Sequence, residues 1–402
     1  MVRKVAGLVL LATALLTIPV RAQERPPVEI AASAYHTFGQ QAVFAVTVTA
    51  PEPVRDLYLH LEIAATGQGE VVHLAVEPAL TVQAEYGRDL RLQPFPPFSQ
   101  VRWWWEVWYG DDGRFEDEAA TLHYVDNRFR WRSHTAGALS VHTVVEDPAY
   151  SQAALEVAQA SLARIAWELG NPQLAVSGPV DVYVYPSLAD LQAALEMAGR
   201  EWIAGQARPE LGVALVAIPP SGNYYAQMER DISHELSHLL VYDSVGAQGY
   251  THIPDWLDEG LATANEPRRD PTLDSLLEQA RSEGTLFTPA QLCQPFPEDA
   301  RRALLAYAQS ASLVRYIRQR YGGEGIRALL AAYADGTGCQ EGVRIALGVT
   351  MEQLDQAWRA DLAGLSGWLT WISEHLPWLL LWALSLLLAL PIAGALRRPR
   401  RP

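Results

Sequence analysis

The chain has 402 residues, of which 49% are hydrophobic, and a formal net charge of −15 at pH 7. Residues 1–22 and 397–402 hold seven basic side chains and no acids, which leaves about −22 for the remainder. A body this acidic argues against nucleic-acid binding and against a broad footprint on lipid. The only cysteines, Cys293 and Cys339, are too few for a four-cysteine zinc site, and outside the cytoplasm a disulfide between them is the expected state.

The N-terminus has the pattern of a secretory signal. Residues 1–22 contain Arg3 and Lys4, then an apolar run, then Val20-Arg21-Ala22 before Gln23. An N-terminal membrane anchor is the alternative, but the apolar run is short and is interrupted by Pro19 and two threonines. We therefore expect cleavage after Ala22.

The C-terminus predicts one transmembrane helix at residues 377–396. Trp378 to Leu396 carries no charge and is long enough to cross the hydrocarbon layer once. The basic tail 397–402 places the C-terminus in the cytoplasm. A buried core helix is the alternative, but residues 379–390 are apolar on nearly every face. The expected location is the cell membrane, with a single crossing and an extracytoplasmic ectodomain.

Residues 23–132 predict an all-β, sandwich-like domain. Its expected strands are residues 42–48, 57–63, 71–76, 101–109 and 121–125, with proline and glycine clusters between them. The tryptophans of the fourth strand, Trp103, Trp104, Trp105 and Trp108, are expected to divide between its two faces. They could form a ligand platform, although a core with one covered face is the commoner use of such residues.

Residues 137–366 predict a mixed, mostly α-helical domain. The expected strands are residues 180–185 and 212–218. The expected helices before the central motif are 151–169 and 188–197, and those after it are 272–281, 300–321, 326–334, 343–347 and 351–362. The fold class is therefore α+β, with a β domain, a mostly helical domain and one C-terminal transmembrane helix.

The central motif is His234-Glu235-Leu236-Ser237-His238. Apolar residues recur around it at helical spacing, so the segment is expected to be a helix. On a helix, His234 and His238 leave the same face and can bind one metal ion. Glu235 lies beside them, where it can accept a proton from a metal-bound water.

A catalytic zinc site normally needs a third protein ligand. A histidine six residues after the second one is absent, because Ser244 occupies that position. The other common source is a glutamate on a following helix, and Glu259 lies twenty-one residues after His238. Pro254 and Trp256 are expected to fix that helix, and Gly260 to remove side-chain bulk beside the metal.

The two motifs together, H-E-L-S-H and P-x-W-L-x-E-G-L-A at residues 254–262, resemble the gluzincin clan of zinc metallopeptidases, in particular the peptidase MA-like group. The chain is more distantly similar to the M1 aminopeptidases. The resemblance implies one Zn²⁺ per chain with His234, His238 and Glu259 as ligands, Glu235 as general base, and a peptide or protein substrate. It also implies that strand 212–218 is an edge strand that pairs with the substrate backbone. An ordinary sheet strand is the alternative.

Tyr307 lies in a helix similar to the Y-x-K-G helix of M1-type enzymes, in which the tyrosine stabilises the oxyanion. The match is loose, because Gln309 and Ser310 replace the lysine and glycine. Tyr307 could instead pack a helix face. No segment like G-[AG]-M-E-N precedes the helix, so aminopeptidase activity is not implied.

These features predict a membrane-anchored, extracytoplasmic zinc metallopeptidase. The alternative from another class is a catalytically silent, membrane-anchored binding protein that retains the scaffold. The presence of Glu235 argues against it, because a structural metal site needs no base. A metal-dependent hydrolase acting on something other than peptides is a second alternative.

Overall fold

The computed structural model describes residues 28–174, 176–195, 205–364, 375–378 and 381. The predicted signal peptide 1–22 and tail 397–402 lie outside this part, as does the predicted transmembrane segment apart from residues 377, 378 and 381. Within the described part, no helix has the length and apolar character needed to span a bilayer. Two compact units are present, one formed by residues 28–94 and 100–123 and the other by residues 95–99 and those from 124 onward.

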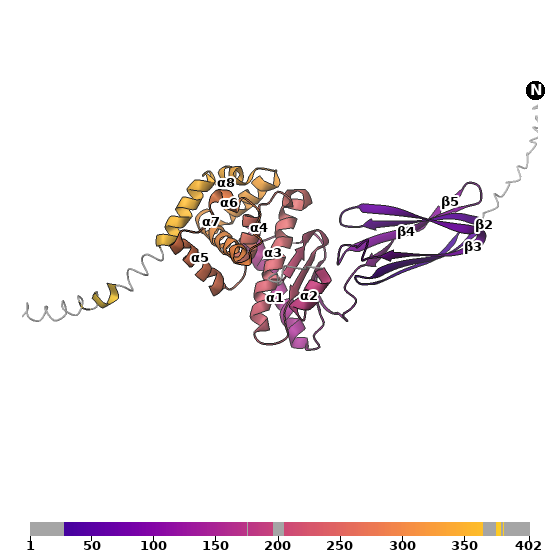
Figure 1. Cartoon of the computed structure of the whole chain (residues 1–402), viewed down its shortest axis with the longest axis horizontal. Coiled ribbons are helices and arrows are strands. Elements are labelled where there is room, and N and C mark those ends of the chain that lie inside the picture. The colour runs from indigo at the N-terminus through magenta and orange to yellow at the C-terminus, as the bar shows by residue number, and fades with distance from the viewer. Residues whose placement is uncertain (1–27, 175, 196–204, 365–374, 379–380, 382–402) are drawn as a thin grey trace, which may run out of the picture. The chain divides into compact units, whose positions relative to one another are not determined.

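The first unit consists of antiparallel strands (Figure 1). They are β1 (Glu29–Thr37), β2 (Gln41–Ile63), β3 (Gln68–Asp89), β4 (Gln100–Tyr109), β5 (Gly113–Glu116) and β6 (Ala120–His123). The two strands predicted at 42–48 and 57–63 are one strand, β2, with a register irregularity between Thr49 and Val54. The prolines at 51 and 53 lie in this irregularity because they have no N–H to donate to a ladder.

The irregularity lets the long β2–β3 ribbon fold back on itself. The first half of β2 pairs with β1 and the second half with β4. Phe44, in the first half, nevertheless lies with its ring 5.6 Å from that of Trp103 on β4. A straight strand would keep these rings far apart, so the two halves face each other across a shared core.

The tryptophans of β4 divide between its faces, as predicted. Trp103 and Trp105 are 6% and 0% exposed, whereas Trp104 is half-buried and Trp108 is 40% exposed. This alternation follows the two-residue period of a strand.

The second unit contains a five-stranded sheet followed by helices. The strands are β7 (Arg132–Ala136), β8 (Leu139–Thr143), β9 (Val180–Tyr185), β10 (Gly205–Arg208) and β11 (Val213–Ala217), in the order β10-β11-β9-β8-β7. Helix α1 (Pro148–Glu168) connects β8 to β9, and α2 (Leu188–Leu195) follows β9. The expectation that the strand at 212–218 is an edge strand is wrong, because β11 pairs with β10 on one side and β9 on the other. The edge strand next to β11 is β10, a strand that no pattern in the sequence predicts.

The remaining helices are α3 (Tyr224–Tyr250), α4 (Asp255–Ala264), α5 (Pro271–Glu283), α6 (Pro289–Leu292), α7 (Ala300–Ala334) and α8 (Cys339–Leu347), and residues 351–364 are also helical. Gly246 breaks α3 and Gly322 breaks α7, since each has a positive φ and non-helical ψ. The break at Gly322 agrees with the helix end predicted there. The α+β composition, with a β domain before a helix-rich domain, is confirmed.

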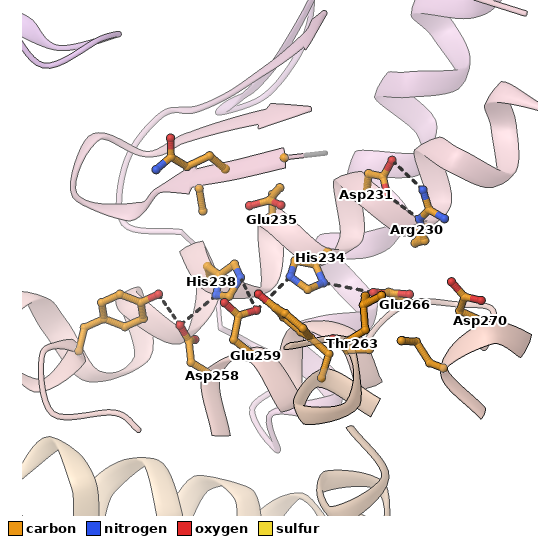
Figure 2. A pocket seen from close by; sticks show the side chains of 17 residues that line it. Arg230, Asp231, His234, Glu235, His238, Asp258, Glu259, Thr263, Glu266 and Asp270 are labelled. Carbon is orange, nitrogen blue, oxygen red and sulfur yellow. Dashed lines mark hydrogen bonds and ion pairs between the residues drawn. The ribbon is translucent and has the colours of Figure 1, made fainter. Parts of the chain in front are cut away.

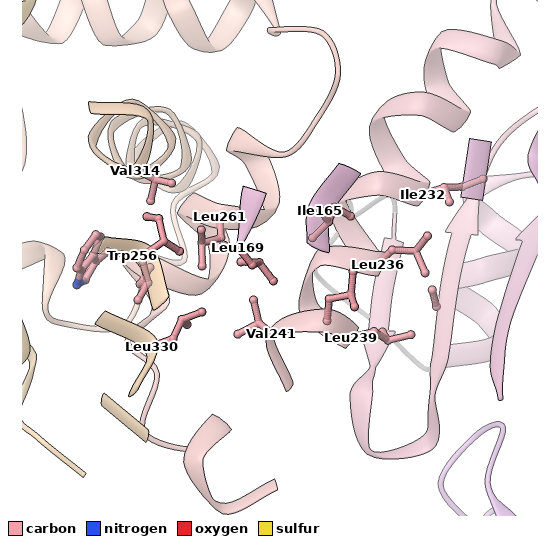
Figure 3. Packing of buried hydrophobic residues seen from close by; sticks show 14 of the residues in the cluster. Ile165, Leu169, Ile232, Leu236, Leu239, Val241, Trp256, Leu261, Val314 and Leu330 are labelled. Carbon is pink, nitrogen blue, oxygen red and sulfur yellow. The ribbon is translucent and has the colours of Figure 1, made fainter. Parts of the chain in front are cut away.

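The core of the second unit joins the sheet to the helices (Figure 3). Ile232, Leu236 and Leu239 on α3 are 0–1% exposed and pack in the same cluster as Ile165 of α1. The same cluster continues to α4 and α7 through Trp256, Leu261, Val314 and Leu330. Burial of this much apolar surface fixes the rotation of α3, and therefore the direction in which its polar residues point.

Gly260 allows α4 to lie directly against α7. A Cβ at position 260 would come within 2.9 Å of Val314 Cγ2 and 3.0 Å of the Ser310 carbonyl oxygen. The expectation that Gly260 makes room beside the metal is therefore corrected: the space it leaves is filled by α7. The disulfide between Cys293 and Cys339, whose Cα atoms are 5.8 Å apart, joins the segments on either side of α7.

We expect Gly260→Ala to destabilise the second unit by about 1–3 kcal/mol, because backbone atoms of α7 would have to move. Urea unfolding followed by helical circular dichroism measures this, since the helices of the described residues lie in the second unit. Gly364→Ala is the matched control, because nothing lies within 4 Å of a Cβ added there. Equal unfolding midpoints for the two variants would contradict the packing argument.

Candidate metal centre

Helix α3 presents two imidazoles on the side opposite its core face, and the carboxyl group of Glu235 lines the same cleft. Asn223 caps the helix by accepting a hydrogen bond from Ala226 N at 3.4 Å. His234 and His238 then follow one helical turn apart, with ring centroids 5.2 Å apart. Because the apolar stripe of α3 is buried, these two rings must point into the cleft on the other side.

Helix α4 brings Glu259 to the same point (Figure 2). Trp256 and Leu257, both 0% exposed, anchor the start of this helix. Glu259 Oε2 lies 3.3 Å from His234 Nε2 and 3.7 Å from His238 Nε2. One donor atom from each of the three residues lies within 4.8 Å of the others. Two imidazole nitrogens and one carboxylate oxygen at this spacing are a suitable donor set for a divalent metal with one position open.

Both imidazoles are oriented by further hydrogen bonds on their other nitrogen. His238 Nδ1 lies 3.0 Å from Asp258 Oδ2, and the Tyr250 hydroxyl donates to the same oxygen at 2.7 Å. His234 Nδ1 lies 3.2 Å from Glu266 Oε1. These contacts leave Nε2 of each ring facing Glu259, which is the orientation needed for both rings to bind one metal ion.

A buried polar network supports the helix behind the metal ligands. Ser233 and Ser237 are 0% exposed and point away from the cleft. Ser233 Oγ lies 2.7 Å from Ser161 Oγ on α1, and Ser237 Oγ accepts from Asn265 Nδ2 at 2.8 Å. These bonds fix α3 against α1 and the end of α4, and so limit the movement of the histidines.

Glu235 is buried in the cleft without a hydrogen-bond partner among the described residues, and its side chain lies under β10. Burial raises its pKa to about 7, and the neighbouring His234 and His238 only partly oppose that shift. A Cβ at Gly205 on β10 would collide with the Glu235 carboxyl group. The closeness of β10 to Glu235 therefore depends on glycine at position 205.

The ligand residues have strongly coupled charges. Burial lowers the pKa of His238, but Asp258 and Glu259 outweigh this and raise it to about 9. The pKa of His234 is well above its usual value, because Glu259 and Glu266 outweigh the effect of burial. Burial acts to raise the pKa of Glu259, yet the two histidines and Tyr307 lower it. Without metal, the carboxylates hold protons on the imidazoles.

A family model for the peptidase MA superfamily matches residues 157–364, which is more than half of the chain. The chain belongs to the peptidase MA superfamily. A search of curated proteins found no match. The matched region contains the whole of β10, α3, α4 and α7, which supply the residues of the cleft described above. Of α1, only the part from residue 157 onward lies within it.

Tyr307 also lies in the peptidase MA cleft. Its hydroxyl lies close enough to Glu259 to lower the pKa of that carboxyl group, and its ring centroid is 6.3 Å from that of His234. Phe296 packs edge-on against the ring at 5.2 Å. Burial and then the neighbouring carboxylates raise the pKa of Tyr307, so the phenol stays protonated at neutral pH and can donate. Tyr307 therefore lines the cleft beside the candidate metal ligands.

The cleft has a volume of about 490 Å³ and receives residues from β10, α3, α4, α5 and α7. The structure brings His234, Glu235, His238, Glu259 and Tyr307 together in it. Sequence reasoning missed four further residues at the site: Gly205, Tyr250, Asp258 and Glu266. Only Asp258 gave a signal, as an acid directly before Glu259.

We expect Asp258→Leu to weaken binding of a divalent ion such as Zn²⁺ or Co²⁺ by about 10–100-fold, because His238 loses the group that orients it. Asp258→Asn keeps an oxygen acceptor and should lose less. Competition against a chelating dye measures both affinities. If the leucine variant bound metal as tightly as the native chain, Asp258 would have no positioning role.

Proposed function

We propose that this chain is a zinc metallopeptidase that hydrolyses peptide bonds. The observation that carries the proposal is the meeting of His234, His238 and Glu259 at one point, with Glu235 beside them in the same cleft. Membership of the peptidase MA superfamily supports peptide or protein substrates. Zinc bound there would supply Lewis acidity, polarising the scissile carbonyl and making a water molecule more acidic.

Glu235 acts as the general base in this proposal. A carboxyl group with a pKa raised to about 7 by burial can accept a proton from water and return it to the leaving amine near neutral pH. Burial of the Glu235 carboxyl group is unfavourable in free energy, and no hydrogen bond from another described residue offsets it. This is why we favour the enzyme over the binding protein, in which such a residue has no task.

The substrate backbone is proposed to add to the sheet beside β10. The strand Gly205–Arg208 is one of the two edge strands of the sheet, and Gly205, Gln206 and Ala207 line the cleft. An extended peptide paired there would lie alongside Glu235, because Gly205 packs against that carboxyl group. Tyr307 approaches from α7 and is proposed to donate its phenolic proton to the oxyanion of the tetrahedral intermediate.

We further propose that the enzyme is membrane-anchored and acts outside the cytoplasm. The patterns at residues 1–22 and 377–402 support this, and both lie almost entirely outside the described residues. The disulfide between Cys293 and Cys339 is in keeping with an oxidising compartment.

Glu235→Gln should reduce peptide cleavage by at least about 10²–10⁴-fold while metal stays bound, because the amide cannot accept the proton and is not a ligand. Cleavage of a peptide mixture, measured by mass spectrometry beside metal content, tests this. Glu283→Gln, an exposed glutamate on α5, is the control and should be unaffected. Full cleavage by Glu235→Gln would refute the base assignment. Stoichiometric zinc without cleavage by the native chain would favour the binding protein.

Tyr307→Phe should lower kcat by about 10²–10³-fold with little change in KM, because the donor it removes is proposed to act on the oxyanion and not on the bound substrate. Steady-state kinetics on the best peptide from the mixture separate the two constants. If the variant instead lost zinc while keeping its kcat per bound zinc, Tyr307 would serve Glu259 rather than the oxyanion.

Zinc affinity should increase with pH between 6 and 8, by about tenfold per pH unit for each proton displaced. The reason is that the pKa of His238 is raised to about 9 and that of His234 well above its usual value, so zinc must displace protons from the imidazoles over this range. Chelator competition at several pH values measures the slope. A flat profile would show that the histidines are already neutral before zinc binds.

A further inference from the structure

A second cleft in the same unit is lined by arginines. It has a volume of about 640 Å³ and lies between the end of α1 and the middle of α7. Arg315 and Arg318 enter it from one face of α7, and Arg269 enters from the segment between α4 and α5. Three guanidinium groups in one cleft are unexpected in a chain with a net charge of −15.

Two of these guanidinium groups have no partner in the described part of the chain. Neither Arg269 nor Arg315 forms a hydrogen bond or ion pair with another described residue. Arg318 donates to Asn265 Oδ1 at 2.8 Å, and its Nε lies 3.0 Å from Glu168 Oε2. That ion pair is imperfect, since neither Nε nor Oε2 has hydrogen-bonding geometry to any partner.

The acids around the cleft form no ion pair with Arg269 or Arg315 in the described part of the chain, although Glu266, Asp270 and Asp274 line a small adjoining cavity with both arginines. Glu168 forms its ion pair with Arg318. Glu324 is mostly exposed and pairs with Arg327 at 3.3 Å. On the other side of Arg315, Asp274 and Glu266 act at longer range, and Glu266 is already bonded to His234. Burial lowers the pKa of Arg315, and repulsion by Arg269 lowers it further. An anion between these groups would relieve both effects.

The walls of the cleft suit a ligand larger than one ion. Trp167, which is 65% exposed, borders it, so an indole forms part of the wall. The floor is closed by backbone contact between Gly170 and Gly323, where an added Cβ on Gly323 would come within 2.7 Å of Gly170 Cα.

We propose that this cleft binds a small multivalent oxyanion, with its phosphate or carboxylate groups held by Arg269 and Arg315 and supported by Arg318. Guanidinium groups form paired hydrogen bonds with either kind of oxyanion. The arginines therefore favour a negatively charged ligand but do not by themselves distinguish a phosphate from a carboxylate. This binding site is separate from the metal ligands and does not depend on peptidase activity.

The test is isothermal titration of the full-length chain with inorganic pyrophosphate, and with succinate as the carboxylate probe, at matched ionic strength. We expect saturable binding of at least one probe. Arg315→Gln should weaken it by at least about tenfold, the value of one charge-assisted hydrogen bond. Arg320→Gln is the matched control, because Arg320 is exposed on the same helix and does not line the cleft.

Arg269→Gln is a second variant, used in case Arg315→Gln fails to fold. Arg269 is exposed on a loop, so its substitution leaves the packing of the core unchanged. It should also weaken binding at least tenfold. Preference for pyrophosphate or for succinate identifies the ligand chemistry. Binding that survives both substitutions, or no binding of either probe by the native chain, would overturn the proposal.

Discussion

The candidate metal centre depends on the direct contact between α4 and α7 at Gly260. This contact sets the depth of α4, and therefore the position at which Glu259 meets the imidazoles of α3. The same α7 carries Tyr307 into the cleft. Because Gly260 has no side chain, α4 and α7 lie close enough to bring Glu259 and Tyr307 to the same point as the histidines of α3. The buried apolar stripe of α3 fixes the direction in which the histidines point.

Charge is the second organising factor. Glu235, Glu259, Asp258 and Glu266 surround two histidines inside a folded domain, which would be costly without compensation. In the metal-free chain, imidazolium groups provide that compensation. A divalent ion would replace two protons with two positive charges at nearly the same place. The site is therefore preorganised for a dication by the carboxylates around the ligands as well as by the ligands themselves.

The sequence predicted those site residues whose relation is local. His234, Glu235 and His238 follow from helical spacing, and Glu259 follows from its linked motif. Glu266 and Tyr250 could not be predicted, because they reach the histidines only through the end of α4 and the break of α3 at Gly246. The four-residue strand β10 has no pattern of its own, so the sequence does not indicate which strand forms this edge of the sheet. The two prolines of β2 likewise predict a gap between two strands, but pairing with β3 on both sides of them outweighs local propensity.

The disulfide has a consequence for a chain that is proposed to cut peptides. Cys293 and Cys339 lie on either side of α7, so the covalent loop encloses the whole helix, including Tyr307 and Arg315. A single break in the chain between the cysteines would leave both fragments attached to each other. A cut made there by another copy of the chain or by another protease would separate the fragments on a gel only after the disulfide is reduced. The disulfide would hold the two fragments of the cut domain together around the cleft.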